Sequence, residues 1–345
     1  MGQSELNLVC EYLCCSYFLP NKRTFSRPNM AECVEYRGYR FPATTVKDLE
    51  FAGNELQVLD DDVFNVTYPK SGTTWMIEIL SLIHTNGDPT WSKETPNWSR
   101  VPWIEIQDSE ETIKKIQDRR RYLSSHLPRQ LFCKSFTNSK AKVIYTARHP
   151  KDVAVSFYHF SKINKFFAYP ESFDDFLKNF LSGNLPYGSW FDHVKGWLEL
   201  VGTDNFLFNT YEDLQKDLRG TLKRICAFIG KELDEAALDS VMENVSFHIM
   251  KDNRMANFSL VPEKIMDQTQ NRFMRKGIAG DWKNHFTVAQ SEYFDKVFKE
   301  KMADIGVKLP WDWKNHLTVP QSKYFDCIYK EKMKDFNYKF PWDET

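Results

Sequence analysis

The chain has no long apolar segment, little net charge and no ordered arrangement of cysteines. None of its segments reaches the roughly 18 consecutive apolar residues of a membrane-spanning helix, so no transmembrane segment is predicted. The formal net charge of −1 argues against a surface built for nucleic acid, and a basic run at 119–121 is interpreted as a solvated helix face. The seven cysteines show neither metal-ligand spacing nor a paired framework, so a reducing compartment, the cytoplasm, is expected.

The first residues also lack a targeting pattern. No basic stretch followed by an apolar stretch begins the chain, and Leu6 stands where the myristoylation pattern requires Ser or Thr. Cys14 and Cys15 precede an aromatic segment and are candidates for palmitoylation. An irregular tail is the alternative that we favour, and residues 1–30 are interpreted as an irregular extension.

A strand, a turn and a helix follow one another around Lys70. Residues 63–67 predict a strand, and the apolar spacing that begins at Trp75 predicts a helix. The turn within residues 68–75 brings together backbone N–H groups, the positive end of the helix dipole, a lysine and several hydroxyl groups. This combination predicts an anion-binding loop. An ordinary loop with a solvated lysine is the alternative, because such short strings recur by chance.

The same order of elements recurs along the chain. Residues 142–147 predict a second strand, which Arg148 and a helix over 152–160 follow, and residues 205–211 predict a third strand. Alternation of this kind predicts an α/β fold with a parallel sheet and helices on both faces. Ligands bind such sheets at the carboxyl ends of the strands, where Lys70 and Arg148 fall.

A second basic motif near the end of the chain favours the anion-binding interpretation. Residues 275–282 read Arg-Lys-Gly-Ile-Ala-Gly-Asp-Trp. Together with the loop at 68–75 and Arg148, this motif resembles the cytosolic sulfotransferase family, whose 5′-phosphosulfate loop and 3′-phosphate motif both match without a gap. The resemblance extends from about Tyr39 to Trp311.

The resemblance implies a single α/β domain and a nucleotide donor, 3′-phosphoadenosine 5′-phosphosulfate (PAPS), which is used without a metal. Such a donor needs two positive sites a nucleoside apart, and guanidinium groups suit phosphate because they bind it with two hydrogen bonds. Val245 departs from the hydroxyl residue usual at its position. The residues implied for the donor are Lys70, Ser71, Gly72, Thr73, Thr74, Trp75, Arg148, Ser156, Tyr211, Val245, Ser246, Phe247, Met250, Phe273, Met274, Arg275, Lys276 and Gly277.

His126 and Lys70 match the family's catalytic residues. Sulfonate transfer to an alcohol requires a base for the acceptor proton, and imidazole serves near neutral pH. A fixed cation stabilises the transition state more than the ground state. The resemblance therefore implies His126 as the base and Lys70 as the electrophile, whereas a histidine before Leu-Pro taken alone is a surface-loop residue.

The acceptor is expected to be a hydroxysteroid or another small apolar alcohol, because segments 102–105, 189–193 and 309–311 resemble the hydroxysteroid branch more than the phenol branch. A phenol or amine acceptor and a non-catalytic nucleotide-binding paralogue stay open as alternatives. An apolar acceptor pocket is expected from loops 92–107 and 254–272. Candidates for its lining, or equally for the core, are Trp98, Trp103, Phe157 and Phe258.

A kinase or another P-loop NTPase is the competing enzyme class. The Gly-x-x-x-x-Gly-Lys-Ser pattern of that class is absent, and Lys70 precedes its glycine. Arg148 closes the second strand, where a metal-binding aspartate is typical. Magnesium is therefore expected to be dispensable.

The end of the chain contains a tandem duplication. Residues 281–311 recur in 312–345, so we predict a sulfotransferase domain over 31–311 and an appended copy of its last segment. Both copies carry a capping box, Thr287 with Gln290 in the first and Thr318 with Gln321 in the second. The family's dimerisation pattern matches in the first copy. Its residues are Lys283, Thr287, Val288 and Glu292. The second copy has Lys323 in place of the glutamate, and plain helix capping is the interpretation we favour there.

Overall fold

The computed structural model of the 345-residue chain describes residues 33–42, 45–106, 108–117, 119–269, 271–305, 307 and 309. The expected extension at 1–30 and the appended copy at 312–345 lie outside these residues. The chain divides into two compact units, residues 1–281 and 282–345. No helix within the described ranges is both long and apolar enough to cross a membrane.

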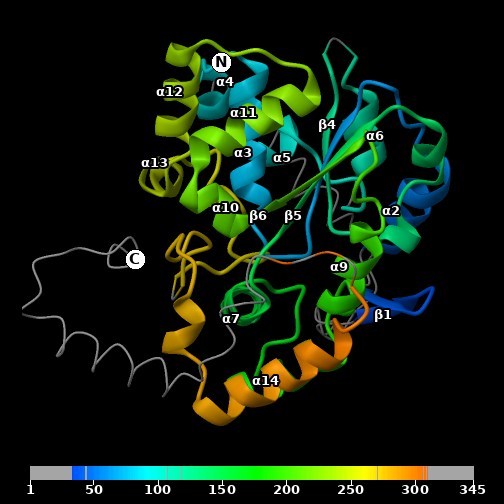
Figure 1. The fold of residues 1–345 in the computed structure, drawn as a ribbon, viewed down its shortest axis with the longest axis vertical. Coiled ribbons are helices and arrows are strands. Elements are labelled where there is room, and N and C mark those ends of the chain that lie inside the picture. Colours follow the sequence, from blue (N-terminus) through cyan, green and yellow to red (C-terminus); the bar gives the residue numbers. More distant parts are fainter. Residues whose placement is uncertain are drawn as a thin grey trace, which may run out of the picture. The chain divides into compact units, whose positions relative to one another are not determined.

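A four-stranded parallel sheet forms the centre of the first unit (Figure 1). The strands are β3 (Val63–Val66), β4 (Tyr122–Ser125), β5 (Lys142–Ala147) and β6 (Phe206–Thr210), in the spatial order β4-β3-β5-β6. Because β4 and β5 lie on opposite sides of β3, the winding of the chain reverses there, and doubly wound sheets bind ligands at such a point. The predicted α/β fold with a parallel sheet is confirmed.

Short helices and a hairpin surround the sheet. Antiparallel strands β1 (Cys33–Tyr36) and β2 (Tyr39–Pro42) form the hairpin. The helices before β5 are α2 (Val46–Glu50), the π-helix η2 (Phe51–Glu55), α3 (Thr73–His84), α4 (Thr90–Glu94), α5 (Asn97–Arg100), α6 (Ser109–Lys114), η3 (Arg129–Leu131) and η4 (Lys134–Asn138). Those after β5 are α7 (Pro150–Ser161), α8 (Phe173–Ser182), α9 (Trp190–Leu198), α10 (Tyr211–Lys216), α11 (Leu218–Ile229), α12 (Glu235–Asn244), α13 (Phe247–Asp252), η5 (Asp281–Asn284) and α14 (Val288–Lys301).

Helices cover both faces of the sheet. Val63 and Ile144 belong to a buried cluster that α3, α11 and α12 complete. On the other face, the ring of Tyr145 stacks on Trp197 of α9, with centroids 5.8 Å apart (Figure 1). Adjacent residues 144 and 145 face opposite sides because side chains alternate along a strand. Burial on both faces explains why β3 and β5 are nearly continuous apolar runs.

Two local features differ from the sequence-based expectations. Residues 122–125 form the buried strand β4, which pairs with β3 and was not predicted. The run 119–121 leads into this strand, so its interpretation as a solvated helix face was wrong. Arg121 forms an ion pair with Asp62 at 2.5 Å, and Arg119 donates to the carbonyl of Arg100 at 2.9 Å. Both arginines thus have polar partners within the protein, which a charge pattern alone does not reveal.

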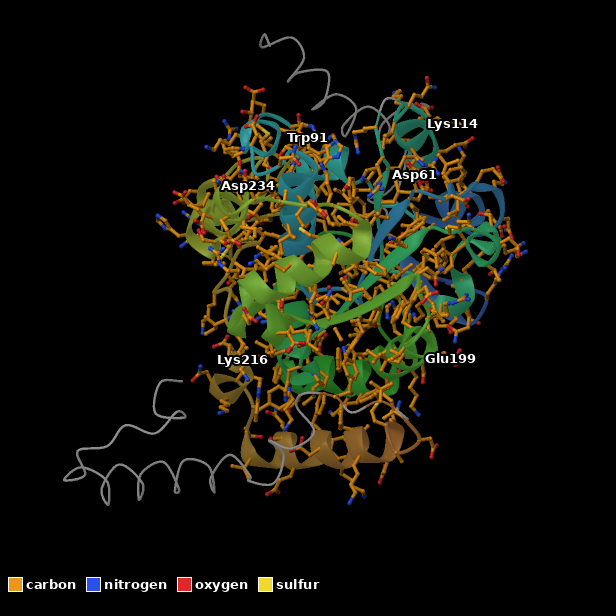
Figure 2. The ribbon with its side chains drawn as sticks, turned by 45° about the horizontal axis from the view of Figure 1, so that its top comes forward. Asp61, Trp91, Lys114, Glu199, Lys216 and Asp234 are labelled. Atoms are coloured by element: carbon orange, nitrogen blue, oxygen red, sulfur yellow. The ribbon has the colours of Figure 1, made fainter. Side chains whose placement is uncertain are left out.

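Charged side chains lie around the outside of the first unit, as Figure 2 shows for Lys114, Glu199 and Asp234. In the second unit, α14 begins at the predicted capping box. The Thr287 hydroxyl accepts a hydrogen bond from the Gln290 N–H at 3.2 Å, and the Gln290 side chain accepts one from the Thr287 N–H at 2.8 Å. The second capping box, at Thr318, lies outside the described residues.

Candidate active site

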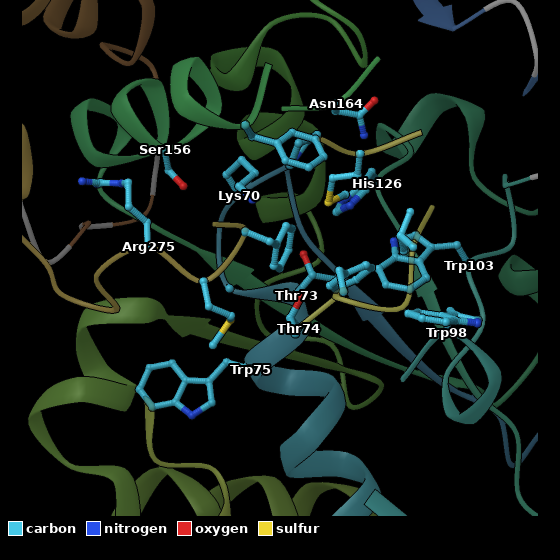
Figure 3. A pocket seen from close by; sticks show the side chains of 18 of the residues that line it. Lys70, Thr73, Thr74, Trp75, Trp98, Trp103, His126, Ser156, Asn164 and Arg275 are labelled. Atoms are coloured by element: carbon cyan, nitrogen blue, oxygen red, sulfur yellow. The ribbon is translucent and has the colours of Figure 1, made fainter. Parts of the chain in front are cut away.

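A cavity of about 390 Å³ brings the two predicted anion-binding motifs together. Figure 3 shows Ser156 and Arg275 at one end of it and Trp98 and Trp103 at the other, with Lys70 between them. We call the first part the anion cradle: Lys70, Gly72, Thr73, Thr74, Arg148, Ser156, Arg275, Lys276 and Gly277. We call the second the apolar chamber: Trp98, Trp103, Ile106, Asn164, Phe166, Phe167, Tyr187, Phe258, Ile265 and Met266.

The loop between β3 and α3 has a backbone that favours anion binding. Gly72 precedes α3 with φ of 109°, and Lys70 also has a left-handed backbone with φ of 69°. A Cβ on Gly72 would lie 3.0 Å from the ring of Tyr211, so a larger residue would be strained by its backbone conformation and would press against this ring. The loop therefore directs the amino-terminal N–H groups of a twelve-residue helix toward the cavity.

Arg148 links the two motifs of the anion cradle. Its guanidinium donates to the carbonyl oxygen of Lys70 at 3.3 Å and to that of Ile278 at 2.9 Å. The guanidinium also lies over the ring of Tyr211, 4.3 Å from its centroid. The loop after β3 and the distant segment after Met274 are thus held by a single charged side chain at the end of β5.

Asp281 orients the basic pair of the second motif. Its carboxylate contacts the guanidinium of Arg275 at 2.6 Å and the ammonium of Lys276 at 2.5 Å, and its side chain is 1% exposed. Gln215 accepts a hydrogen bond from the Ala279 N–H at 2.9 Å and donates to the carbonyl of Gly277 at 2.6 Å. These contacts hold the segment through Gln215 of α10 and Asp281 at the start of η5.

Several polar atoms around the cradle are buried and have no hydrogen-bond partner among the described residues. They include the Ser71 hydroxyl, the Arg148 Nε and the Trp75 indole nitrogen. Buried polar groups are normally satisfied, so such a concentration suits a polar ligand. Over the described ranges, no group of three or more His, Cys, Asp or Glu side chains is placed to hold a metal ion.

The ammonium of Lys70 lies between two aromatic rings. Its nitrogen is 4.2 Å from the centroid of Phe160 and 4.0 Å from that of Phe273. Burial, followed by the charges of Arg148 and Arg275, lowers the pKa of Lys70 to about 7. A bound anion would favour the charged form, because an opposite charge nearby raises the pKa of a lysine.

The imidazole of His126 follows directly after β4, at the carboxyl end of the sheet. Its Nδ1 donates to the carbonyl oxygen of Thr67 at 2.9 Å. A carbonyl oxygen only accepts, so this contact assigns the proton to Nδ1 and leaves the lone pair on Nε2. Burial first, and then the charge of Lys70, lower the pKa of His126 to about 4. The ring is therefore neutral near pH 7 and carries its lone pair on Nε2.

Hydrogen bonds fix the position of this histidine. Its backbone N–H donates to Glu105 Oε1 at 2.6 Å. The Thr67 hydroxyl lies 3.2 Å from His126 Nδ1 and 2.6 Å from the hydroxyl of Thr73, the first residue of α3. The ring of Tyr187 packs edge-on against the imidazole, with centroids 5.4 Å apart. The hydroxyl groups of Thr67 and Thr73 thus connect His126 with the anion loop.

The structure places most of the residues implied for the donor, and His126, on this cavity. The exceptions are Ser71, which is buried, and Ser246, which caps α13 by accepting from the Ile249 N–H. The rings of Trp75 and Tyr211 lie 5.2 Å apart. The ring of Phe247 leaves no space for a Cβ on Gly277, which would lie 2.1 Å away. The roles of these residues remain predictions.

The apolar chamber is drawn from more segments than the sequence analysis named. Trp98, Trp103 and Phe258 line it, while Phe157 is fully buried in the core. Tyr187 and Asn164 were missed. The left-handed backbone of Tyr187, with φ of 70°, is not evident from a Leu-Pro-Tyr-Gly string. Proline followed shortly by glycine indicates a turn but not what the turn faces.

Taken together, the fold and the cavity define an α/β enzyme. It binds a nucleotide through an anion-binding loop beside a neutral histidine. The family model described as "Sulfotransferase domain" matches residues 60–306. The chain belongs to the sulfotransferase family and is a sulfotransferase enzyme. The predicted family resemblance is confirmed.

Two relatives and two solved structures illustrate the similarity. Sulfotransferase 2B1 of Mus musculus is 51% identical over 284 residues, which cover 81% of this chain and 83% of that protein. The 3-beta-hydroxysteroid sulfotransferase of Cavia porcellus is 48% identical over 279 residues, which cover 80% and 96%. Mouse sulfotransferase SULT7A1 complexed with PAP has a TM-score of 0.67 at 32% identity and coverage of 80% and 96%. Retinol dehydratase in complex with androsterone and PAP has a TM-score of 0.72 at 25% identity and coverage of 81% and 93%.

Proposed function

We propose that this enzyme transfers a sulfonate group from PAPS to the hydroxyl of a hydroxysteroid. The observation that carries the proposal is the junction of the anion cradle and the apolar chamber at a neutral histidine. The nucleotide PAP, named with two of the similar structures, is the donor without its sulfonate. The relative named 3-beta-hydroxysteroid sulfotransferase supports the acceptor class.

The anion cradle suits a nucleotide with phosphate groups at both ends of its ribose. Lys70 and the amino terminus of α3 hold the 5′ end, and Arg148, Ser156, Arg275 and Lys276 hold the 3′-phosphate. The rings of Trp75 and Phe247 enclose the adenine. The Trp75 indole nitrogen and the Arg148 Nε, which are buried and have no hydrogen-bond partner in the part of the chain that the structure describes, fit such a ligand. When bound, PAPS supplies the sulfonate group.

His126 removes the proton from the acceptor hydroxyl through Nε2. The hydrogen bond from Nδ1 to the Thr67 carbonyl holds the required tautomer and stabilises the imidazolium that forms. Lys70 supplies a positive charge at the mouth of the loop, where it balances negative charge that develops during transfer. The chamber excludes water and orients the acceptor by shape.

A transfer assay with labelled sulfonate tests the proposal. The wild-type protein is incubated with labelled PAPS and matched panels of sterols, bile acids, phenols and amines. We expect labelled product from hydroxysteroids at a higher kcat/KM than from phenols or amines. A higher kcat/KM for phenols or amines would show that they, and not hydroxysteroids, are the acceptors. Binding of nucleotide without transfer to any panel member would favour a non-catalytic paralogue instead.

Three further predictions concern organisation. Lys283, Thr287, Val288 and Glu292 are proposed to form a homodimer contact, and the side chain of Val288 is 37% exposed, as a contact residue would be. The sulfotransferase domain is proposed to span 31–311. The cytoplasm is proposed as the compartment, which unpaired Cys33, Cys133 and Cys226 support among the cysteines that the structure describes. Sedimentation of Val288→Glu against wild type tests the dimer contact, with a shift to monomer expected.

A further inference from the structure

Asn164 is a polar residue held rigidly in the wall of the apolar chamber. It lies just beyond α7, where it forms an antiparallel bridge with Met266. The Lys165 N–H donates to the carbonyl of Ile265 at 2.9 Å, and the Asp267 N–H donates to the carbonyl of Ile163 at 2.7 Å. Backbone hydrogen bonds on both sides of Asn164 therefore fix its position relative to the segment around Met266.

The side-chain amide of Asn164 has a defined orientation. Its Oδ1 accepts a hydrogen bond from the N–H of Phe166 at 2.9 Å. Since a backbone N–H needs an acceptor, this contact assigns the oxygen and leaves the NH₂ group as the other end of the amide. The NH₂ group has no hydrogen-bond partner in the described parts of the chain. Figure 3 shows Asn164 among the lining side chains, with this nitrogen on the side toward His126.

The surroundings of this NH₂ group make it costly to cover with a hydrocarbon. The neighbouring lining residues Phe166, Phe167 and Ile265 offer no side-chain acceptor. The indole nitrogens of Trp98 and Trp103 are buried and have no hydrogen-bond partner among the described residues. They are donors, so they cannot accept a hydrogen bond from the amide. An apolar acceptor that filled the chamber would leave the amide donor without a hydrogen bond, which is unfavourable.

We propose that Asn164 Nδ2 donates a hydrogen bond to a second oxygen on the acceptor, distinct from the hydroxyl that reacts at His126. The inference rests on the proposed function and narrows its substrate class to apolar alcohols that carry a further ketone or hydroxyl oxygen. Acceptors without that oxygen bind the same chamber but leave Asn164 unpaired. Asn164 is thus a specificity-determining residue and takes no part in proton transfer.

Two substitutions separate this role from a structural one. Asn164→Asp keeps an oxygen for the Phe166 N–H but replaces the donating NH₂ group with an oxygen that only accepts when ionised. Asn164→Leu removes both polar atoms at similar volume. Lys165→Gln, at the next position of the same bridged segment, is the matched control, because Lys165 is exposed and does not line this cavity. Any effect common to all three variants reflects packing of the loop.

The acceptors are matched pairs of hydroxysteroids that differ by one oxygen, a ketone or a hydroxyl on the B ring, the D ring or the side chain. The first readout is binding to the PAP-saturated protein, followed through tryptophan fluorescence, which needs no turnover. The second is kcat and KM for sulfonate transfer. Both readouts are made for the wild type and for each of the three variants.

For at least one pair, the wild type is expected to bind the oxygenated member about fivefold to a hundredfold more tightly, since an unpaired buried donor carries a penalty of that size. Asn164→Asp should lose the preference for the ketone but keep that for the hydroxyl, and Asn164→Leu should lose both. The effect should appear in KM while kcat stays within about twofold. Lys165→Gln should keep every preference.

Preferences that survive in Asn164→Leu for all pairs, or that fall equally in Lys165→Gln, would overturn this inference alone. Failure of the wild type to bind or sulfonate any of these steroids would instead overturn the proposed function, and the inference with it. Loss of binding to all members of all pairs in Asn164→Asp, with PAP binding intact, would assign the residue to the shape of the chamber and contradict the role in selection.

Discussion

The anion cradle and the apolar chamber line one cavity, yet they are encoded in different ways. Three compact segments supply the cradle. Hydrogen bonds to the backbone, such as those that the Arg148 guanidinium donates to the carbonyl oxygens of Lys70 and Ile278, fix its geometry. The chamber takes single side chains from many loops, among them Trp98, Tyr187 and Phe258. Phosphate groups require N–H groups and charges at set positions, which demands particular residues in sequence. An apolar surface requires only shape, which many sequences provide.

The largest expected effect separates chemistry from nucleotide binding. His126→Ala should lower the turnover of a hydroxysteroid by about 10² to 10⁴, because the residue proposed as the base for the acceptor proton is lost. Affinity for PAP should stay within about twofold, since the imidazole lies on the chamber side. Steady-state kinetics and equilibrium titration of the same preparation measure both. Retained turnover would show that His126 has only a structural role.

A second substitution affects the cradle and spares the chamber. Arg275→Ala should weaken PAP binding by about 2 to 5 kcal/mol, because it removes one partner of a largely desolvated charge contact and leaves Asp281 less well compensated. Arg272→Ala is the matched control, since Arg272 is exposed and does not line this cavity. Isothermal titration of both variants gives the comparison. Equal affinities for the two variants would remove Arg275 from the phosphate site.

Much of the cradle was predictable from the sequence, whereas the chamber was not. Lys70 and Arg148 follow strands β3 and β5, so their convergence followed from the parallel sheet, and Arg275 stands in a contiguous basic motif. Strand β4 escaped prediction because Tyr-Leu-Ser-Ser has no clear apolar period, and the strand is buried through its pairing with β3. Asn164 was missed because its importance depends on a distant bridge to Met266, which a local pattern does not encode.

The pH dependence of nucleotide binding sharpens the electrostatic side of the comparison. The pKa of Lys70 without an anion is lowered to about 7, and an anion raises it, so binding is coupled to proton uptake above that pH. Affinity for PAP should be constant below pH 7 and fall by up to about tenfold per pH unit above it. Lys70→Arg, which stays charged, should flatten this profile. A fall of equal slope in Lys70→Arg would assign the proton to another group.

A substitution in the chamber should have the converse and smaller effect. Phe258→Leu removes ring contacts with Trp98 and Phe273, whose centroids lie 5.6 Å and 4.3 Å away. The KM for a hydroxysteroid should rise by about threefold to thirtyfold, since edge and face contacts of aromatic rings add about 0.5 to 1.5 kcal/mol to their area burial. PAP affinity should change less than twofold. A larger loss of PAP affinity than of steroid affinity would break the division into two parts.

The smallest effect is expected from truncation after Asp312. The appended copy lacks the Arg-Lys-Gly motif that precedes Asp281, so it has no phosphate site to contribute. Turnover and PAP affinity should stay within about twofold, while melting temperature and light scattering report any role in packing or association. Loss of activity in a truncated protein that remains folded would show that the appended copy completes the active site.

Nucleotide selectivity without metal tests the central claim most directly. PAP and ATP are titrated separately into the wild-type protein in the presence of a chelator, and the heat of binding is recorded. We predict that PAP binds at least about a hundredfold more tightly than ATP, because Arg148 and Arg275, which are largely buried, are proposed to bind a 3′-phosphate that ATP lacks, and each such charge contact is worth more than about 1.4 kcal/mol. Tighter binding of ATP, or binding of PAP only after magnesium is restored, would contradict the account.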